Sequence, residues 1–172
     1  MSVRMIAVTA VCIAIVTALV RVVLAPTPMG GYIHPGTVAE VFVALAFGPV
    51  VGMAAAGLGA AISDVTLGFG SFAPLTLVAH GALGWLAGWL GWKKGRGGMV
   101  TGWIVGGLVL VAVYFIGEAT VYDFGIAGAS AELPWNLIQV SLGLMGLVLF
   151  QLVKRAYPQI EGLASGAEFK EG

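Results

Sequence analysis

The sequence predicts an all-α membrane protein, a compact bundle of six transmembrane helices with both termini in the cytoplasm. The first observation is composition: 59% of the 172 residues are hydrophobic and 9% are charged, whereas soluble domains carry about 25% charged residues. The second is length, because roughly 20 apolar residues are needed per crossing and connections use the remainder. The third is the placement of Lys and Arg along the chain, which favours an even number of crossings.

The first apolar run covers residues 5–25 and follows Arg4. A cleaved signal peptide is an alternative interpretation. It is disfavoured because the run is long for the apolar part of a signal peptide and contains Arg21 near its end. Small residues recur every four positions on this span, at Ala10, Ala14 and Ala18. Such rows allow close helix approach, either within the bundle or against another membrane protein.

The second and third spans are predicted over 37–48 and 50–67, where Gly48 and Pro49 separate two apolar stretches. The second span is short for a full crossing, so it is expected to be short, tilted, or extended by part of "GGYIHPG". The remaining spans are predicted over 73–92, 99–121 and 133–153. Residues 1–156 would then form one transmembrane domain, and the polar, Gly-rich residues 157–172 a cytoplasmic tail.

Charge placement tests the number of spans independently, because short cytoplasmic loops accumulate Lys and Arg. Arg4 and the "KKGR" stretch lie about 88 residues apart, a distance that suits four crossings better than two. Six spans with a cytoplasmic N-terminus place nearly all of the basic residues inside, leaving only Arg21 toward the outside; the inner set is Arg4, Lys93, Lys94, Arg96, Lys154, Arg155 and Lys170. The same topology places the chain in the cytoplasmic membrane as a multi-pass protein.

Polar residues within the spans share one depth, the outer half of the bundle. Ionisable side chains in a membrane are costly and commonly indicate a functional site. Thr76 and His80 are four residues apart on one helix face, and Asn136 and Gln139 are three apart on another. We therefore predict a substrate-binding set of Glu40, Thr76, His80, Glu118, Tyr122, Trp135, Asn136 and Gln139, with Tyr32 and His34 in a gating loop above it.

This set is typical of a site for a small polar ring compound, because aromatic faces supply area and amides or carboxylates fix orientation. The surplus of acidic residues favours a cationic or amino-bearing ligand. Structural alternatives stay open: Trp135, Tyr122 and Tyr32 could form an interfacial aromatic belt, and Thr76 could be a packing hydroxyl. Asp64 could cap a helix, pair with Arg21 or form the rim of the pocket, so direct contact is expected of His80 rather than of Asp64.

Signatures of enzymes are missing from the sequence. It contains no Walker-type loop, no HExxH and no Gly-x-Ser-x-Gly motif, and we predict neither catalysis nor a cofactor. Its single cysteine, Cys12, excludes a disulfide framework. Two histidines alone make a poor transition-metal site, so no metal is expected, and the lack of a basic stripe argues against nucleic acid as a partner.

Four stretches stand out: the Gly48-Pro49 turn, the third span ending "SDVTLGFG", "APLTLVAHGALGWLAG" in the fourth span and "LPWNLIQVSLG" in the last. They resemble the substrate-binding S components of energy-coupling factor (ECF) vitamin transporters. The likeness covers about residues 5–153. It implies a six-helix subunit that captures a vitamin or related micronutrient at the outer face.

The resemblance also implies partners: a transmembrane coupling (T) protein and two cytoplasmic ATPase subunits that drive release inside. The row of Ala10, Ala14 and Ala18 would make the coupling contact, and the loop from Pro26 to Gly36 would act as the gate. Thr76, His80, Asn136 and Gln139 match ligand-facing positions of the family's motif regions. Relatives often have Asn and Asp where "HPGT" stands here and Lys where His80 stands, so a different ligand is expected.

Two other functions are compatible with the residues alone. The chain could be a structural or assembly subunit of a membrane complex, whose polar residues satisfy one another. It could also be a stand-alone carrier that uses Asp64, Glu118 and His80 for coupling, although no inverted repeat is visible.

Overall fold

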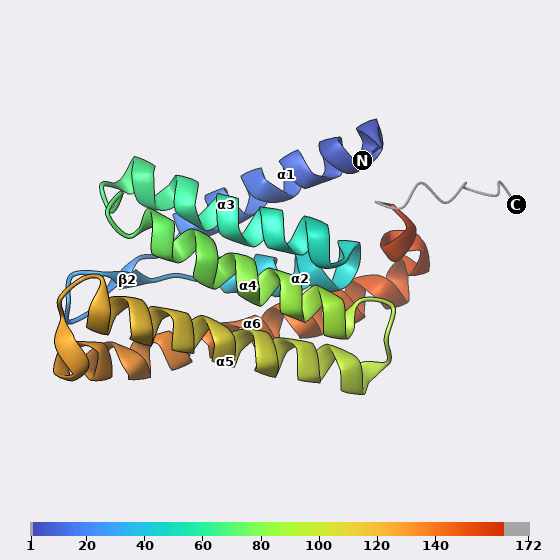
Figure 1. Ribbon diagram of the computed structural model, residues 1–172. Coiled ribbons are helices and arrows are strands. Elements are labelled where there is room, and N and C mark those ends of the chain that lie inside the picture. The colour runs from blue at the N-terminus through green and yellow to red at the C-terminus, as the bar shows by residue number, and fades with distance from the viewer. Residues whose placement is uncertain (1, 164–172) are drawn as a thin grey trace, which may run out of the picture.

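The computed structural model describes residues 2–163 of the chain. The predicted fold class is confirmed: six α-helices form one bundle (Figure 1), and five of them are long and apolar enough to cross a membrane. A 3-10 helix, η1 (Pro158–Gly162), follows the last of them. The helices are α1 (Val3–Val20), α2 (Gly36–Phe47), α3 (Pro49–Leu67), α4 (Ala73–Gly91), α5 (Arg96–Thr120) and α6 (Gly125–Ala156).

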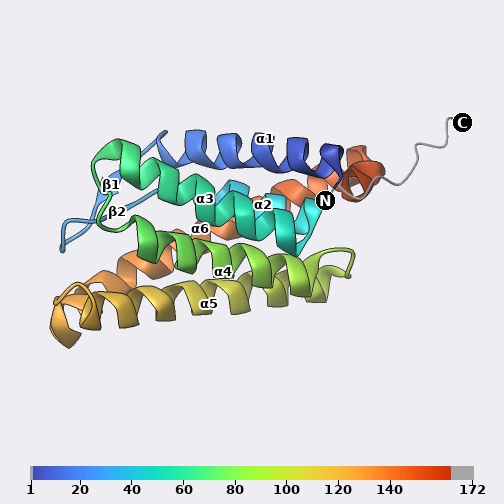
Figure 2. The ribbon, with the colours of Figure 1, turned by 45° about the horizontal axis from the view of Figure 1, so that its top comes forward.

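The chain reverses direction at each connection, so both ends of the described chain lie at the same end of the bundle (Figures 1 and 2). Helices α3, α4 and α5 lie side by side, α1 packs on α3, and α6 packs on α5. Between α1 and α2 the short strands β1 (Ala25–Pro26) and β2 (Tyr32–Ile33) pair antiparallel. This hairpin lies at the end opposite the termini, which we call the outer end.

Charge agrees with this topology. Lys93, Lys94 and Arg96 lie at the connection between α4 and α5, and Lys154 and Arg155 lie in the last turn of α6, all at the end that holds the termini. Positively charged connections face the cytoplasm, so both ends of the described residues, 2–163, lie on the side predicted to be cytoplasmic. Large apolar side chains are exposed along the helices, as expected of a surface that faces lipid.

Helix α2 is the central element of the bundle. It contacts α1, α3, α4 and α6, and most of its side chains are buried. Its 12 residues span about 18 Å at 1.5 Å per residue, well short of a hydrocarbon core of about 30 Å. It ends where Gly48 adopts φ +89° and Pro49 begins α3. The remaining depth is occupied by the connection from α1, which carries the buried side chain of His34.

Glycine allows α3 and α4 to lie close together. A Cβ atom at Gly84 would lie 2.3 Å from the carbonyl oxygen of Gly52, and one at Gly88 would lie 2.6 Å from the nitrogen of Pro49. Small residues on facing helices are the expected means of association where lipid supplies no hydrophobic drive. The close contact places Asp64 of α3 at the same depth as Thr76 of α4, because both lie near the outer ends of their helices.

Two helix boundaries differ from the prediction. Helix α1 ends at Val20, where the chain turns toward the hairpin. The side chain of the next residue, Arg21, donates a hydrogen bond to the hydroxyl of Thr66. Helix α6 begins at Gly125 instead of 133 and contains Pro134. A proline within a helix is tolerated in membrane proteins, because neighbouring groups satisfy the carbonyl that it leaves free.

The polar segment after α6 is partly packed. Ile160 of η1 is buried and joins the core cluster of α2 and α6, and Lys154 pairs with Glu161 at 2.8 Å. The rest of the predicted tail, residues 164–172 with Lys170, lies outside the described residues. The division into a domain of residues 1–156 and a tail of 157–172 stays a prediction.

Candidate functional site

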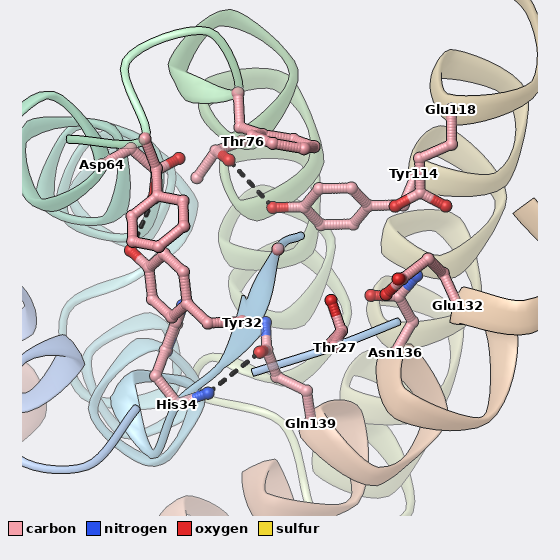
Figure 3. A pocket seen from close by; sticks show the side chains of 13 residues that line it. Thr27, Tyr32, His34, Asp64, Thr76, Tyr114, Glu118, Glu132, Asn136 and Gln139 are labelled. Atoms are coloured by element: carbon pink, nitrogen blue, oxygen red, sulfur yellow. Dashed lines mark hydrogen bonds between the residues drawn. The ribbon is translucent and has the colours of Figure 1, made fainter. Parts of the chain in front are cut away.

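A small polar cavity lies at the outer end of the bundle. Its walls come from the α1–α2 connection, from the turn between α3 and α4, and from four helices (Figure 3). The lining residues are Thr27, Gly31, Tyr32, His34, Asp64, Phe69, Phe72, Thr76, Tyr114, Glu118, Glu132, Asn136 and Gln139. The cavity volume is about 40 Å³, room for about one water molecule. Sites for small molecules usually measure about 300–1,000 Å³, so a ligand of that kind requires the cavity to open.

The α1–α2 connection closes one side of the cavity through hydrogen bonds to the helices. The hydroxyl of Tyr32 donates to Asp64 Oδ1 at 2.6 Å. The backbone N–H of His34 donates to Gln139 Oε1 at 3.1 Å, and that of Met29 donates to Glu132 Oε1 at 2.6 Å. Three bonds to α3 and α6 therefore hold this connection shut, and opening the cavity on this side means breaking them.

A second hydrogen-bonded group lies directly beneath the cavity. His80 Nδ1 lies 2.9 and 2.8 Å from the two carboxylate oxygens of Glu40, and both side chains are fully buried. On the other side of the ring, His80 Nε2 lies 3.3 Å from Gln139 Nε2. The partners assign the roles: Nδ1–H donates to Glu40, and Nε2 accepts from the Gln139 amide, whose oxygen accepts from His34. This series of hydrogen bonds links α2, α4 and α6 to the α1–α2 connection.

The far side of the cavity is acidic and aromatic. Glu118 of α5 and Glu132 of α6 lie with Asn136 in one corner, opposite Asp64 (Figure 3). The Tyr114 side chain lies between this corner and Asp64, and its hydroxyl lies 3.0 Å from the hydroxyl of Thr76. Such a site combines carboxylates, amides and ring faces, which suits it to bind and orient a polar compound; no nucleophile and base arrangement is present among these lining residues.

The structure brings together six of the predicted site residues, which all line the cavity: Tyr32, His34, Thr76, Glu118, Asn136 and Gln139. Glu40 and His80 lie beneath it as a mutually bonded pair. Tyr122 turns away, donating to the carbonyl of Ser71 at 2.5 Å and stacking on Phe72 at 5.0 Å. Trp135 is half-buried and does not line the cavity. Ligand contact by any of these residues stays a prediction.

Several lining residues were not predicted. Tyr114 lies one turn before Glu118 on the same face of α5, so helical spacing was a usable signal. Glu132 belongs to the acidic residues at the outer end, but Pro134 led to a predicted helix start beyond it. Phe69 and Phe72 lie in a short turn, and nothing in their local pattern shows that their rings face inward. Asp64, whose role the sequence left open, does line the cavity.

Comparison with known proteins identifies the family. The sequence profile of the ECF-type riboflavin transporter S component matches residues 1–155. The chain belongs to this family of S components. A protein of Pyrococcus woesei, described as an uncharacterized protein in the gap 3' region, is 36% identical over 155 residues, covering 87% of this chain and 99% of its own.

Two further relatives agree with the assignment. The thiamine precursor transporter HmpT of Lactococcus lactis subsp. cremoris (strain MG1363) is 33% identical over 100 residues, 58% of this S component and 55% of HmpT. A solved structure of the S component of a bacterial ECF transporter superposes with a TM-score of 0.67 at 19% identity, covering 90% of this chain and 95% of the other. At that identity the structural match shows the fold.

Membership settles the general role of the protein. An S component is the substrate-binding subunit of an ECF transporter, a multi-pass protein of the cell membrane, and belongs to a family of transporter subunits and not of enzymes. The family implies a T protein and ATPases as partners and a vitamin-like substrate.

Acid is expected to open the loop of this S component. The His34 side chain is buried and its Nδ1 accepts the backbone N–H of Gly36 at 3.2 Å. Burial, with the neighbouring His80, holds the pKa of His34 well below its ordinary value. A depressed pKa means that the closed loop is fully stable above about pH 6.5, the pKa of an unfolded histidine, and loses stability as the pH falls below it.

Hydrogen exchange of residues 27–34 at pH 7.5 and 5.5, corrected for the intrinsic rate, would measure this opening. We expect greater opening at pH 5.5 in the wild type and a smaller pH dependence in His34→Asn. An equal pH dependence in both proteins would assign the effect to groups other than His34.

Proposed function

We propose that this S component captures a water-soluble vitamin or vitamin precursor in the outer cavity and delivers it together with a T protein and two ATPases. The observation that carries the proposal is the cavity itself: a buried polar site at the outer end, covered by the connection that holds Tyr32 and His34. The names of the related proteins, a riboflavin transporter family and a thiamine precursor transporter, support a vitamin-type substrate.

The unsatisfied groups of the cavity favour capture over a purely structural role. In an assembly subunit, buried polar residues would be expected to satisfy one another, as Glu40 and His80 do. Within residues 2–163, however, Asp64 Oδ2 and Glu118 Oε2 are buried without a hydrogen-bond partner. Buried polar atoms are normally paired, so these two carboxylates are suited to a ligand that enters when the loop opens.

We propose that the T protein docks on the exposed side of α1. Ala10, Ala14 and Ala18 are all exposed, on the side of α1 that α2 and α3 leave uncovered. A row of small side chains allows a second helix to approach its backbone closely. Ile15 and Val11 are exposed beside the row and supply apolar contact area.

Ala14→Leu is expected to separate capture from transport. The added side chain faces away from the bundle, so ligand binding by the isolated subunit should be unchanged. Uptake by cells that also express the T protein and ATPases should fall at least about fivefold, because an overpacked contact commonly loses about 1–3 kcal/mol. Ala112→Leu is the matched control, since Ala112 is equally exposed but lies on α5, away from α1.

Native mass spectrometry of the purified subunit in nanodiscs would provide the binding measurement, with one vitamin-sized adduct expected per chain. Lack of any adduct, with loss of complex assembly in Ala14→Leu, would favour an assembly subunit. Uptake into sealed vesicles by the subunit alone would favour a stand-alone carrier. Normal uptake by Ala14→Leu would refute the proposed docking surface.

A further inference from the structure

The cavity has hydrogen-bond acceptors that the protein leaves open. Asp64 and Glu118 are each 4% exposed, and in the part of the chain that is described Asp64 Oδ2, Glu118 Oε2 and Thr27 Oγ1 have no hydrogen-bond partner. All three residues line the cavity. Asp64 and Glu118 lie on opposite sides of it, from α3 and α5 (Figure 3).

Several donors around the cavity are used within the protein. The hydroxyl of Tyr32 donates to Asp64, the hydroxyls of Thr76 and Tyr114 bond to each other, and the backbone N–H of Met29 donates to Glu132. The lining residues include three carboxylates and neither lysine nor arginine. A carboxylate only accepts hydrogen bonds, so Asp64 Oδ2 and Glu118 Oε2, which have no partner within residues 2–163, can each accept an N–H of a bound molecule.

The walls between the carboxylates are aromatic. The rings of Tyr32 and Phe69 lie 4.6 Å apart at 51°, and Phe72 and Tyr114 also line the cavity. Ring faces attract planar compounds by stacking and attract cations through their negative π-face. The rings therefore favour a flat ligand. The carboxylates on opposite sides of the cavity favour a ligand with positive charge or N–H groups at its edges.

We propose that the substrate is a small planar heteroaromatic compound with amino or protonated nitrogen groups, one N–H donor directed to Asp64 and another to Glu118. This inference deepens the proposed function and depends on it. It also predicts rejection: a compound bearing a carboxylate or phosphate would meet three carboxylates with no lysine or arginine among the described lining residues to offset them. A ring with carbonyl oxygens at those edges would leave both carboxylates unpaired.

The test presents the full chain in nanodiscs with an equimolar panel and identifies bound compounds by native mass spectrometry, followed by titration. The panel contains a matched pair, 4-aminopyrimidine and 4-pyrimidinone, together with thiamine as a cationic vitamin, riboflavin as a neutral one and biotin as an anionic one. We expect the amino compound to bind about 10- to 100-fold more tightly than its carbonyl partner, the effect of a hydrogen bond to a charged group.

Glu118→Gln and Asp64→Asn keep the shape of each side chain but remove its charge. The variant at the carboxylate that faces the amino group should reduce the preference for the amino compound at least about tenfold. Asp123→Asn is the matched control, because Asp123 is exposed at the same end of the bundle and does not line the cavity. The ratio of the two affinities separates recognition from stability, since a variant that is merely less stable binds both compounds less well.

The outcomes distinguish this inference from the function on which it rests. Binding of amino or cationic compounds, with the preference reduced in Glu118→Gln or Asp64→Asn, would support both. Selective binding of riboflavin, biotin or 4-pyrimidinone would overturn the inferred chemistry while supporting vitamin capture. Binding of no panel member and no adduct from the native membrane would count against capture itself, and the inference would fall with it.

Discussion

Replacing His80 with leucine is expected to lower the free energy of unfolding by about 3–5 kcal/mol, the usual result of removing the partner of a buried carboxylate. The variant would leave Glu40 fully buried with neither of its carboxylate oxygens bonded to the His80 ring. It would also remove the acceptor for the Gln139 amide, which holds the backbone of His34. Loss of stability and loss of ligand capture should therefore occur together.

Two comparisons make this expectation specific. Lys154→Met breaks the pair with Glu161, in which the lysine is 35% exposed, and should cost less than about 1 kcal/mol. The double variant Glu40→Leu/His80→Leu removes both polar partners and should recover much of the stability without recovering capture. Unfolding by denaturant in mixed micelles would measure all three. A loss below about 1 kcal/mol in His80→Leu would contradict the assigned pair.

Gly84→Val is expected to cost about 3 kcal/mol or more, at the upper end for overpacked sites. Its Cβ would lie 2.3 Å from the carbonyl oxygen and 2.6 Å from the carbonyl carbon of Gly52, both backbone atoms of a packed helix. Side chains can change rotamer, but this contact can be relieved only by separating α3 from α4. Because these helices carry Asp64 and Thr76, capture should weaken as well.

Gly97→Ala is the matched control for this prediction. A Cβ at Gly97 meets no atom within 4 Å, and alanine is favoured over glycine in a helix by about 1 kcal/mol. Thermal unfolding in detergent should therefore show a neutral or slightly more stable protein. Equal stability of Gly84→Val and the wild type would mean that α3 and α4 do not approach as closely as described.

Much of the fold was predictable because a bilayer constrains sequence strongly. Apolar run length gave the number of helices, and the placement of Lys93, Lys94 and Arg4 gave the side on which the ends lie. The Gly48-Pro49 break in the sequence also predicted the short second span. The boundary of α6 was not predictable in this way, because Pro134 reads as a helix start in the sequence and is accommodated within the helix in the folded protein.

The composition of the candidate site was predictable only in part. Helical spacing placed Thr76 with His80 and Asn136 with Gln139 on single faces at the outer end, where the structure also has them. Residue spacing along a helix cannot show which helix faces pack against one another. Tyr122, four residues after Glu118 and predicted to bind substrate with it, turns to the carbonyl of Ser71 instead.

The sequence by itself determined a six-helix membrane bundle with its polar residues at the outer end, because burial in lipid imposes length, hydropathy and charge rules that can be read locally. Only the tertiary structure decided which polar groups satisfy one another. It pairs Glu40 with His80 and leaves one oxygen each of Asp64 and Glu118 open to a cavity of about 40 Å³. That distinction depends on distances of a few ångströms between helices that are far apart along the chain.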